Sequence, residues 1–116
     1  MSLIVEQRNV SDIVVLNLTG RLWILDLPLR DLMSGLLSAG KRHFVLNLAG
    51  VDYMDSSGLG QLVSIWTSVH KNGGYMTLLN PTKRVLRLFA ITRLDSVFEI
   101  CGDETDAVQK ARKASA

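Results

Sequence analysis

The sequence predicts a single α/β domain, and three observations support that prediction. Short runs of β-branched and apolar residues alternate with longer stretches whose apolar residues recur at helical spacing. The chain has 116 residues, of which 47% are hydrophobic and 21% charged, which is typical of a folded globular protein. No internal repeat, linker or low-complexity segment divides it, so residues 1–116 are expected to form one domain. We expect a sheet of four or five strands, with about four helices packed mainly on one side.

The N-terminal third predicts a hairpin followed by a helix. Residues 3–9 and 12–19 are rich in β-branched and apolar side chains and are separated by a short polar break, which favours two paired strands. The next apolar residues recur at helical spacing; they are Leu29, Leu32, Met33, Leu36 and Leu37. We expect Asp26 to cap this helix, Pro28 to lie in its first turn and Gly40 to end it.

The middle of the chain predicts a buried strand and a second amphipathic helix. Residues 44–48 form a short apolar run, which fits a strand inside the sheet. A helical stripe follows from Ser57; its members are Leu59, Leu62, Val63, Trp66, Val69 and His70. The glycines of Asn72-Gly73-Gly74 predict the end of this helix. Ile65 falls off the stripe, so we expect its side chain to be exposed.

The C-terminal third continues the alternation of strands and helices. Residues 75–79 and 97–100 have strand character, and Pro81 is expected to open the helix between them. A last helix is expected from about Glu104 to Lys113.

Composition excludes several classes of function. The formal net charge is only +2 and the basic residues are scattered, which argues against nucleic-acid binding. No apolar run is long enough to cross a bilayer and no signal peptide is recognisable, so we expect a cytoplasmic protein without membrane insertion. The single cysteine, Cys101, has no disulfide partner and no metal-binding cluster beside it, and we interpret it as a small buried hydrophobe. No cofactor or metal is expected.

The most informative segment is residues 53–60, Tyr-Met-Asp-Ser-Ser-Gly-Leu-Gly, which joins the central strand to the second helix. Asp and Ser before an apolar helical stripe are good caps, because their side-chain oxygens accept hydrogen bonds from unpaired amides of the first turn. The same amides and the helix dipole would also tolerate a phosphate on Ser56 or Ser57. The segment therefore predicts either a simple cap or a modification site.

Two glycines in this segment favour the modification site. Gly58 and Gly60 fall in the first turn of the helix, where each costs about 1 kcal/mol relative to alanine. We expect their bare backbone to leave the serines open to an approaching kinase.

The order of a strand, the residues Asp55-Ser56-Ser57-Gly58-Leu59-Gly60 and a helix resembles the sulfate transporter and anti-sigma factor antagonist (STAS) family. It is most similar to the bacterial anti-sigma factor antagonists. The resemblance extends over residues 16–20, 45–48, 72–74 and 85–89. It implies a STAS-like fold with a mixed sheet of four to five strands.

The resemblance also implies a partner switch. In the family, the serine corresponding to Ser56 is phosphorylated by an anti-sigma factor that is itself a serine kinase. The unphosphorylated antagonist captures that kinase and so releases a sigma factor, and a phosphatase resets the cycle. The residues expected at the partner contact are Asp55, Ser57, Gly58, Leu59, Trp23 and Ile65.

One segment departs from the family pattern. Where family members carry Glu, an apolar residue and Asp after Gly20, this chain reads Arg21-Leu22-Trp23-Ile24-Leu25. Trp23 thus replaces an aspartate that lies near the modified serine in the family. The segment is either an altered partner surface or an additional core strand, and the sequence favours neither.

Two other functions are alternatives to the switch. STAS-like modules also serve as constitutive scaffolds in lipid-transport and stress-sensing complexes, and the unusual segment after Gly20 fits such a role. A serine hydrolase would need a base beside Ser56 or Ser57, whereas His43 and His70 lie far along the chain and no nucleophile-elbow pattern surrounds either serine. The sequence therefore predicts a protein that is not an enzyme.

Overall fold

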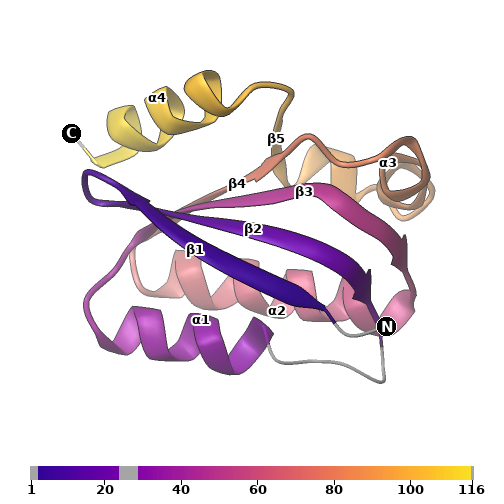
Figure 1. Cartoon of the computed structure of the whole chain (residues 1–116), viewed down its shortest axis with the longest axis horizontal. Helices are drawn as coiled ribbons and strands as arrows, with labels where there is room; N and C mark the ends of the chain where they lie inside the picture. The colour runs from indigo at the N-terminus through magenta and orange to yellow at the C-terminus, as the bar shows by residue number, and fades with distance from the viewer. Residues whose placement is uncertain (1–2, 24–28, 116) are drawn as a thin grey trace.

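The computed structural model describes residues 3–23 and 29–115, with side chains to residue 114. Its strands form one five-stranded sheet in the order β1-β2-β3-β4-β5 (Figure 1). The strands are β1 (Ile4–Val10), β2 (Ile13–Leu22), β3 (His43–Met54), β4 (Tyr75–Leu79) and β5 (Glu99–Cys101). β1 and β2 form an antiparallel hairpin and the other neighbours are parallel, so the predicted mixed sheet is confirmed.

Helices cover both faces of this sheet. They are α1 (Leu29–Ser38), α2 (Ser56–Lys71), α3 (Lys83–Ile91) and α4 (Glu104–Ser115), with a 3₁₀ turn, η1, at Leu94–Ser96. α1 and α2 lie side by side under the sheet and α4 lies on the other face (Figure 1). Buried residues of α3 join the same hydrophobic cluster as those of α1 and α2, so three of the four described helices share one core, as predicted. None of the described helices is long and apolar enough to span a membrane.

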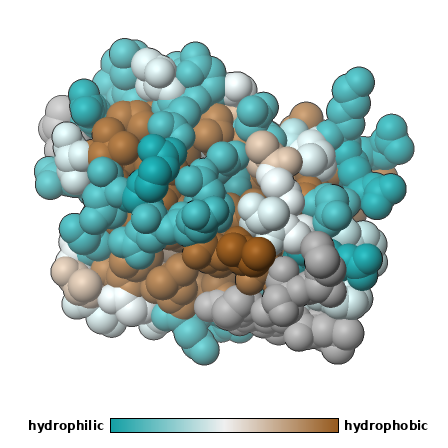
Figure 2. Space-filling view, viewed as in Figure 1, coloured by the Kyte–Doolittle hydropathy of each residue, from teal (hydrophilic) through white to brown (hydrophobic). Residues whose placement is uncertain are grey.

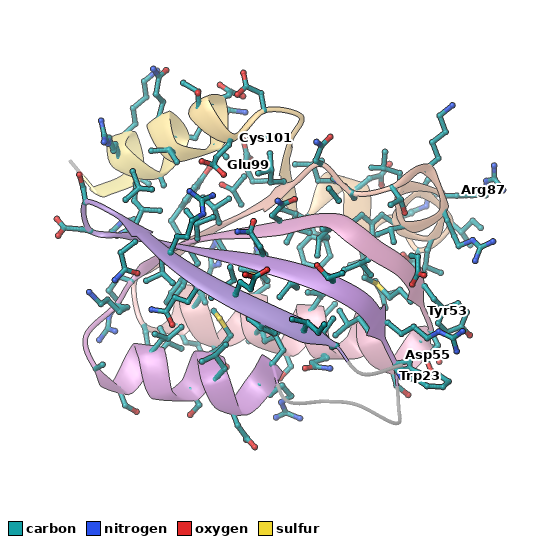
Figure 3. All side chains as sticks on the ribbon, viewed as in Figure 1. Trp23, Tyr53, Asp55, Arg87, Glu99 and Cys101 are labelled. Atoms are coloured by element: carbon teal, nitrogen blue, oxygen red, sulfur yellow. The ribbon has the colours of Figure 1, made fainter. Side chains whose placement is uncertain are left out.

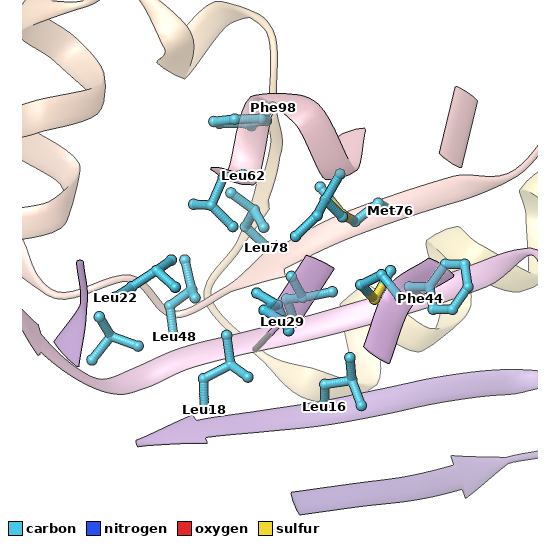
Figure 4. Packing of buried hydrophobic residues seen from close by; sticks show 14 of the residues in the cluster. Leu16, Leu18, Leu22, Leu29, Phe44, Leu48, Leu62, Met76, Leu78 and Phe98 are labelled. Carbon is cyan, nitrogen blue, oxygen red and sulfur yellow. The ribbon is translucent and has the colours of Figure 1, made fainter. Parts of the chain in front are cut away.

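Strand alternation divides the interior into two hydrophobic clusters. Leu16, Leu46 and Leu78 point toward α1 and α2, and Figure 4 shows their neighbours interlocking there. Val15 and Val45 point the opposite way and pack under α4. Each fully buried aliphatic side chain contributes about 1.5–3 kcal/mol, so the larger cluster dominates stability.

Two strands are longer than the sequence predicted. β2 continues through Gly20 to Leu22, and β3 continues past Leu48 to Met54. The pairing register shifts between Asn17/Thr19 and between Gly20/Arg21, and such irregularities bend a strand. Beyond Leu48 the buried residues of β3 recur at every third position, so this extension lacks the alternation by which strands are recognised, whereas β2 keeps its alternation of buried and exposed residues to Leu22.

Boundaries in the C-terminal third also differ from the prediction. α3 begins at Lys83 with Thr82 as its cap, because the Thr82 hydroxyl accepts a hydrogen bond from the Val85 amide, so Pro81 precedes the helix. The last strand begins at Glu99, since the chain forms η1 just before it. The expected roles of Asp26 and Pro28, like residues Ile24 and Leu25, lie outside the described residues.

Candidate functional site

The informative segment lies at the carboxyl edge of the sheet, where β3 ends and α2 begins. Asp55 has an extended backbone, and its Oδ1 accepts a hydrogen bond of 2.8 Å from the amide of Gly58. The carbonyl of Asp55 accepts the amide of Leu59 at 3.0 Å. Asp55 is therefore the cap of α2, a contact that contributes about 1 kcal/mol.

Because Asp55 makes the cap, the two serines are not needed for it. Ser56 is the first residue of α2 and is exposed, whereas Ser57 is half-buried. A negative charge on Ser56 would lie at the positive end of the α2 dipole, where it is favoured. The cap of α2 therefore does not depend on the Ser56 hydroxyl.

Gly58 has a different role from the one predicted. A Cβ at Gly58 would lie 2.0 Å from the carbonyl oxygen of Leu22 and 2.7 Å from its carbon, whereas a Cβ at Gly60 would meet nothing within 4 Å. The amide of Asp55 also donates to the Leu22 oxygen at 3.4 Å. The expectation that both glycines keep the serines open is wrong for Gly58, because the end of β2 already occupies the space beside it.

The unusual segment after Gly20 contacts the site directly. Arg21 pairs with Tyr53 across β2 and β3, and Leu22 is fully buried. Trp23 is half-buried, and its ring meets that of Tyr53 edge-on at a centroid distance of 6.2 Å. Arg21 and Leu22 therefore extend a core strand, while Trp23 lies beside the site with its indole N–H buried and without an acceptor among the described residues.

The guanidinium group of Arg21 covers these aromatic rings. Its central carbon lies 5.1 Å from the centroid of Trp23 and 5.8 Å from that of Tyr53. Figure 3 shows Trp23, Tyr53 and Asp55 at the same end of the molecule. Tyr53 is a residue of the site that was not predicted from the sequence; its aromatic side chain three positions before Ser56 is the signal that could have indicated it.

Two of the expected contact residues belong to the core. Leu59 is 7% exposed and Ile65 only 3%. The expectation that Ile65 is exposed is wrong, because α2 packs against α1 as well as the sheet and so buries more than one stripe. Ile65 also lies about 14 Å along the helix from Ser56. The structure brings together Trp23 and the residues from Asp55 to Leu59, but not Ile65.

Among the described residues, neither histidine lies beside Ser56. His43 begins β3, and His70 stacks on Trp66 in the last turn of α2, so both histidines are remote from Ser56. Cys101 is buried, and burial raises the pKa of its thiol, which disfavours the reactive thiolate. Among residues 3–23 and 29–115, no three His, Cys, Asp or Glu side chains gather in a way that could hold a metal ion.

Comparisons with known proteins show which family and which proteins the chain resembles. The model of the STAS domain family matches residues 5–107. An anti-sigma-B factor antagonist of Bacillus subtilis is 36% identical over 104 residues, which cover 89% of this chain and 94% of that protein.

Two solved structures share the fold. An anti-sigma factor antagonist from Mycobacterium paratuberculosis superposes with a TM-score of 0.84 at 19% identity, over 95% of this chain and 94% of the other. The Bacillus cell fate determinant SpoIIAA in its phosphorylated form superposes with a TM-score of 0.72 at 23% identity, over 92% of this chain and 98% of the other.

Proposed function

The chain belongs to the STAS domain family, and we propose that it acts as an anti-sigma factor antagonist, a partner switch controlled by phosphorylation of Ser56. Unphosphorylated, it binds an anti-sigma factor that is a serine kinase, and a sigma factor is released. A phosphatase that removes the phosphate from Ser56 resets the switch. The name of the Bacillus subtilis relative, an anti-sigma-B factor antagonist, supports this function.

The observation that carries the proposal is that, among the described residues, Ser56 makes none of the contacts by which its motif stabilises the fold. Asp55 caps α2 and Gly58 packs on Leu22, while Ser56 is exposed at the first helical position. A phosphate there adds nearly two negative charges to a protein contact and disfavours association by repulsion and desolvation. The fold remains intact while the contact surface changes.

We place the partner contact on the residues around Ser56. Asp55, Ser57 and Gly58 flank it in the first turn of α2, and Trp23 borders it from the end of β2. Leu59 supports the turn from below, since it is almost fully buried. Residues 1–116 act as one domain without catalysing a reaction, and the action takes place in the cytoplasm, where sigma factors meet RNA polymerase.

The test begins with the anti-sigma factor that copurifies with the Ser56→Ala variant from the native cells. We expect this factor, with Mg²⁺ and ATP, to add one phosphate to the wild-type chain and to Ser57→Ala. Mass spectrometry should find no phosphate on Ser56→Ala. The variant Ser57→Ala is the matched control because it removes the same hydroxyl one residue away.

Binding to the purified factor then separates the candidate functions. If the chain is a switch, the Ser56→Ala variant binds the factor, whereas Ser56→Asp binds it with a Kd at least tenfold higher. That rise corresponds to a loss of about 1.4 kcal/mol of binding free energy. Equal binding of both variants would identify a constitutive scaffold instead. Turnover of a substrate by the chain alone would contradict the non-enzymatic role.

A further inference from the structure

Arg21 brings a positive charge to the end of the sheet at which the segment with Ser56 lies. Arg21, Trp23 and Tyr53 form one continuous contact at the ends of β2 and β3. A guanidinium group that stacks on aromatic rings keeps its charge, and its fork of N–H donors matches a carboxylate. Arg21 is exposed, so this donor set is open to a partner.

Helix α3 extends the positive charge beyond β3. Nη1 of Arg84 lies 3.5 Å from the carbonyl oxygen of Asp52, which ties the first turn of α3 to the strand residue next to Tyr53. Arg87 follows one turn later and is also exposed. Figure 3 places Arg87 at the same end of the molecule as Tyr53 and Trp23, and Figure 2 shows hydrophilic side chains projecting from this end.

Basic side chains outnumber acidic ones in this region, where Arg21, Lys83, Arg84 and Arg87 accompany Asp52 and Asp55. The ion pairs of Arg8 with Glu104 and of Lys110 with Glu99 and Asp106 lie near α4, at the other end of the sheet. None includes Arg21, Arg84 or Arg87.

The position of the cations on α3 is also unfavourable for the isolated chain. The first turn of α3 contains Lys83 and Arg84 and no acidic residue. Cations at a helix N-terminus are opposed by the helix dipole, so stability alone does not explain them. An anionic partner would be attracted by both the side chains and the dipole.

We propose that Arg21, Trp23, Tyr53, Arg84 and Arg87 form a basic aromatic surface that binds an acidic face of the anti-sigma factor. The inference rests on the proposed function, because it states the chemistry of the partner that Ser56 controls. A phosphate on Ser56 would compete with the partner's carboxylates for the same cations. The basic aromatic surface therefore sets which anti-sigma factor is bound, and Ser56 sets when.

The test compares two charge reversals of equal size. Arg21→Glu changes the proposed surface, whereas Lys71→Glu changes an exposed lysine in the last turn of α2, about 22 Å along the helix from Ser56. The probe is the purified anti-sigma factor that phosphorylates Ser56. At low salt we expect Arg21→Glu to raise Kd about tenfold and Lys71→Glu to leave it within about twofold.

Salt and a second variant identify the physical cause. The effect of Arg21→Glu should shrink in about 0.5 M salt, because exposed charges are screened. Trp23→Ala should weaken binding at both salt concentrations, since aromatic contact area is not screened. Thermal unfolding of each variant checks that the fold is retained.

Distinct outcomes separate this inference from the proposed function. Equal Kd values for Arg21→Glu and Lys71→Glu would overturn the inference, while a loss of binding by Ser56→Asp would leave the switch in place. Tighter binding by Arg21→Glu would mean that the partner face is basic, which also overturns it. Arg21-dependent binding to vesicles of anionic phospholipid, with unchanged affinity for the anti-sigma factor, would assign the surface to a membrane instead.

Discussion

Replacing Gly58 by alanine should destabilise the protein, although alanine is the better helix former. The added Cβ would lie 2.0 Å from the Leu22 carbonyl oxygen and 2.7 Å from the attached carbon. Both are backbone atoms of β2, so a side-chain rotation cannot relieve the contact. Either α2 or the end of β2 must move by about 1 Å or more to reach an ordinary contact distance.

The size of the effect follows from two opposing terms. Overpacking of this kind costs about 1–3 kcal/mol, and the rigid backbone places Gly58→Ala near the upper end. The replacement of glycine by alanine in a helix by itself stabilises the fold by about 1 kcal/mol. We therefore expect Gly58→Ala to lower the free energy of unfolding by about 2 kcal/mol.

Gly60→Ala provides the matched control. It is the same substitution in the same helix, but a Cβ at Gly60 meets nothing within 4 Å. It should raise the free energy of unfolding by about 0.5–1 kcal/mol. Urea denaturation followed by circular dichroism measures both variants. If Gly58→Ala proved as stable as Gly60→Ala, the close packing of α2 on β2 would not be the reason for this glycine.

Two further predictions concern the interior. Gln61 is 4% exposed, and both polar atoms of its side-chain amide lack a hydrogen-bond partner among the described residues. Urea denaturation should therefore show that Gln61→Leu raises the free energy of unfolding by about 1–2 kcal/mol. A lower free energy of unfolding would show that the amide is hydrogen-bonded in solution. Burial raises the pKa of the Tyr75 phenol above its ordinary value of 10.0. Because a raised pKa in the folded state favours the protonated form, this contribution to stability is present below pH 10.0 and is lost as the pH rises through the folded-state pKa. Tyr75→Phe should therefore show a shallower alkaline loss of unfolding free energy than the wild type, and parallel curves would contradict the assignment.

The regular elements could be predicted because their periodicity is local. The stripe that includes Leu62 and Val69 predicted α2, and the apolar run from Phe44 to Leu48 predicted the central part of β3. Residues that satisfy such a pattern have one favourable way to bury their apolar side chains. Ile65 does not follow the pattern, because α1 buries it from a direction different from that of the sheet.

The sequence by itself determined the α/β class and the exposure of Ser56 beside a helix cap, while the mixed sheet followed from the resemblance to the STAS family. The class and this exposure depend on hydrophobic periodicity and capping chemistry, which act over a few neighbouring residues. Only the tertiary structure decided that Gly58 is required by Leu22 and that Arg21 lies over Trp23 and Tyr53. The contacts of Leu22 with Gly58 and of Arg21 with Tyr53 join segments more than thirty residues apart, and their geometry depends on the register and bend of β2 and β3, which local patterns do not specify.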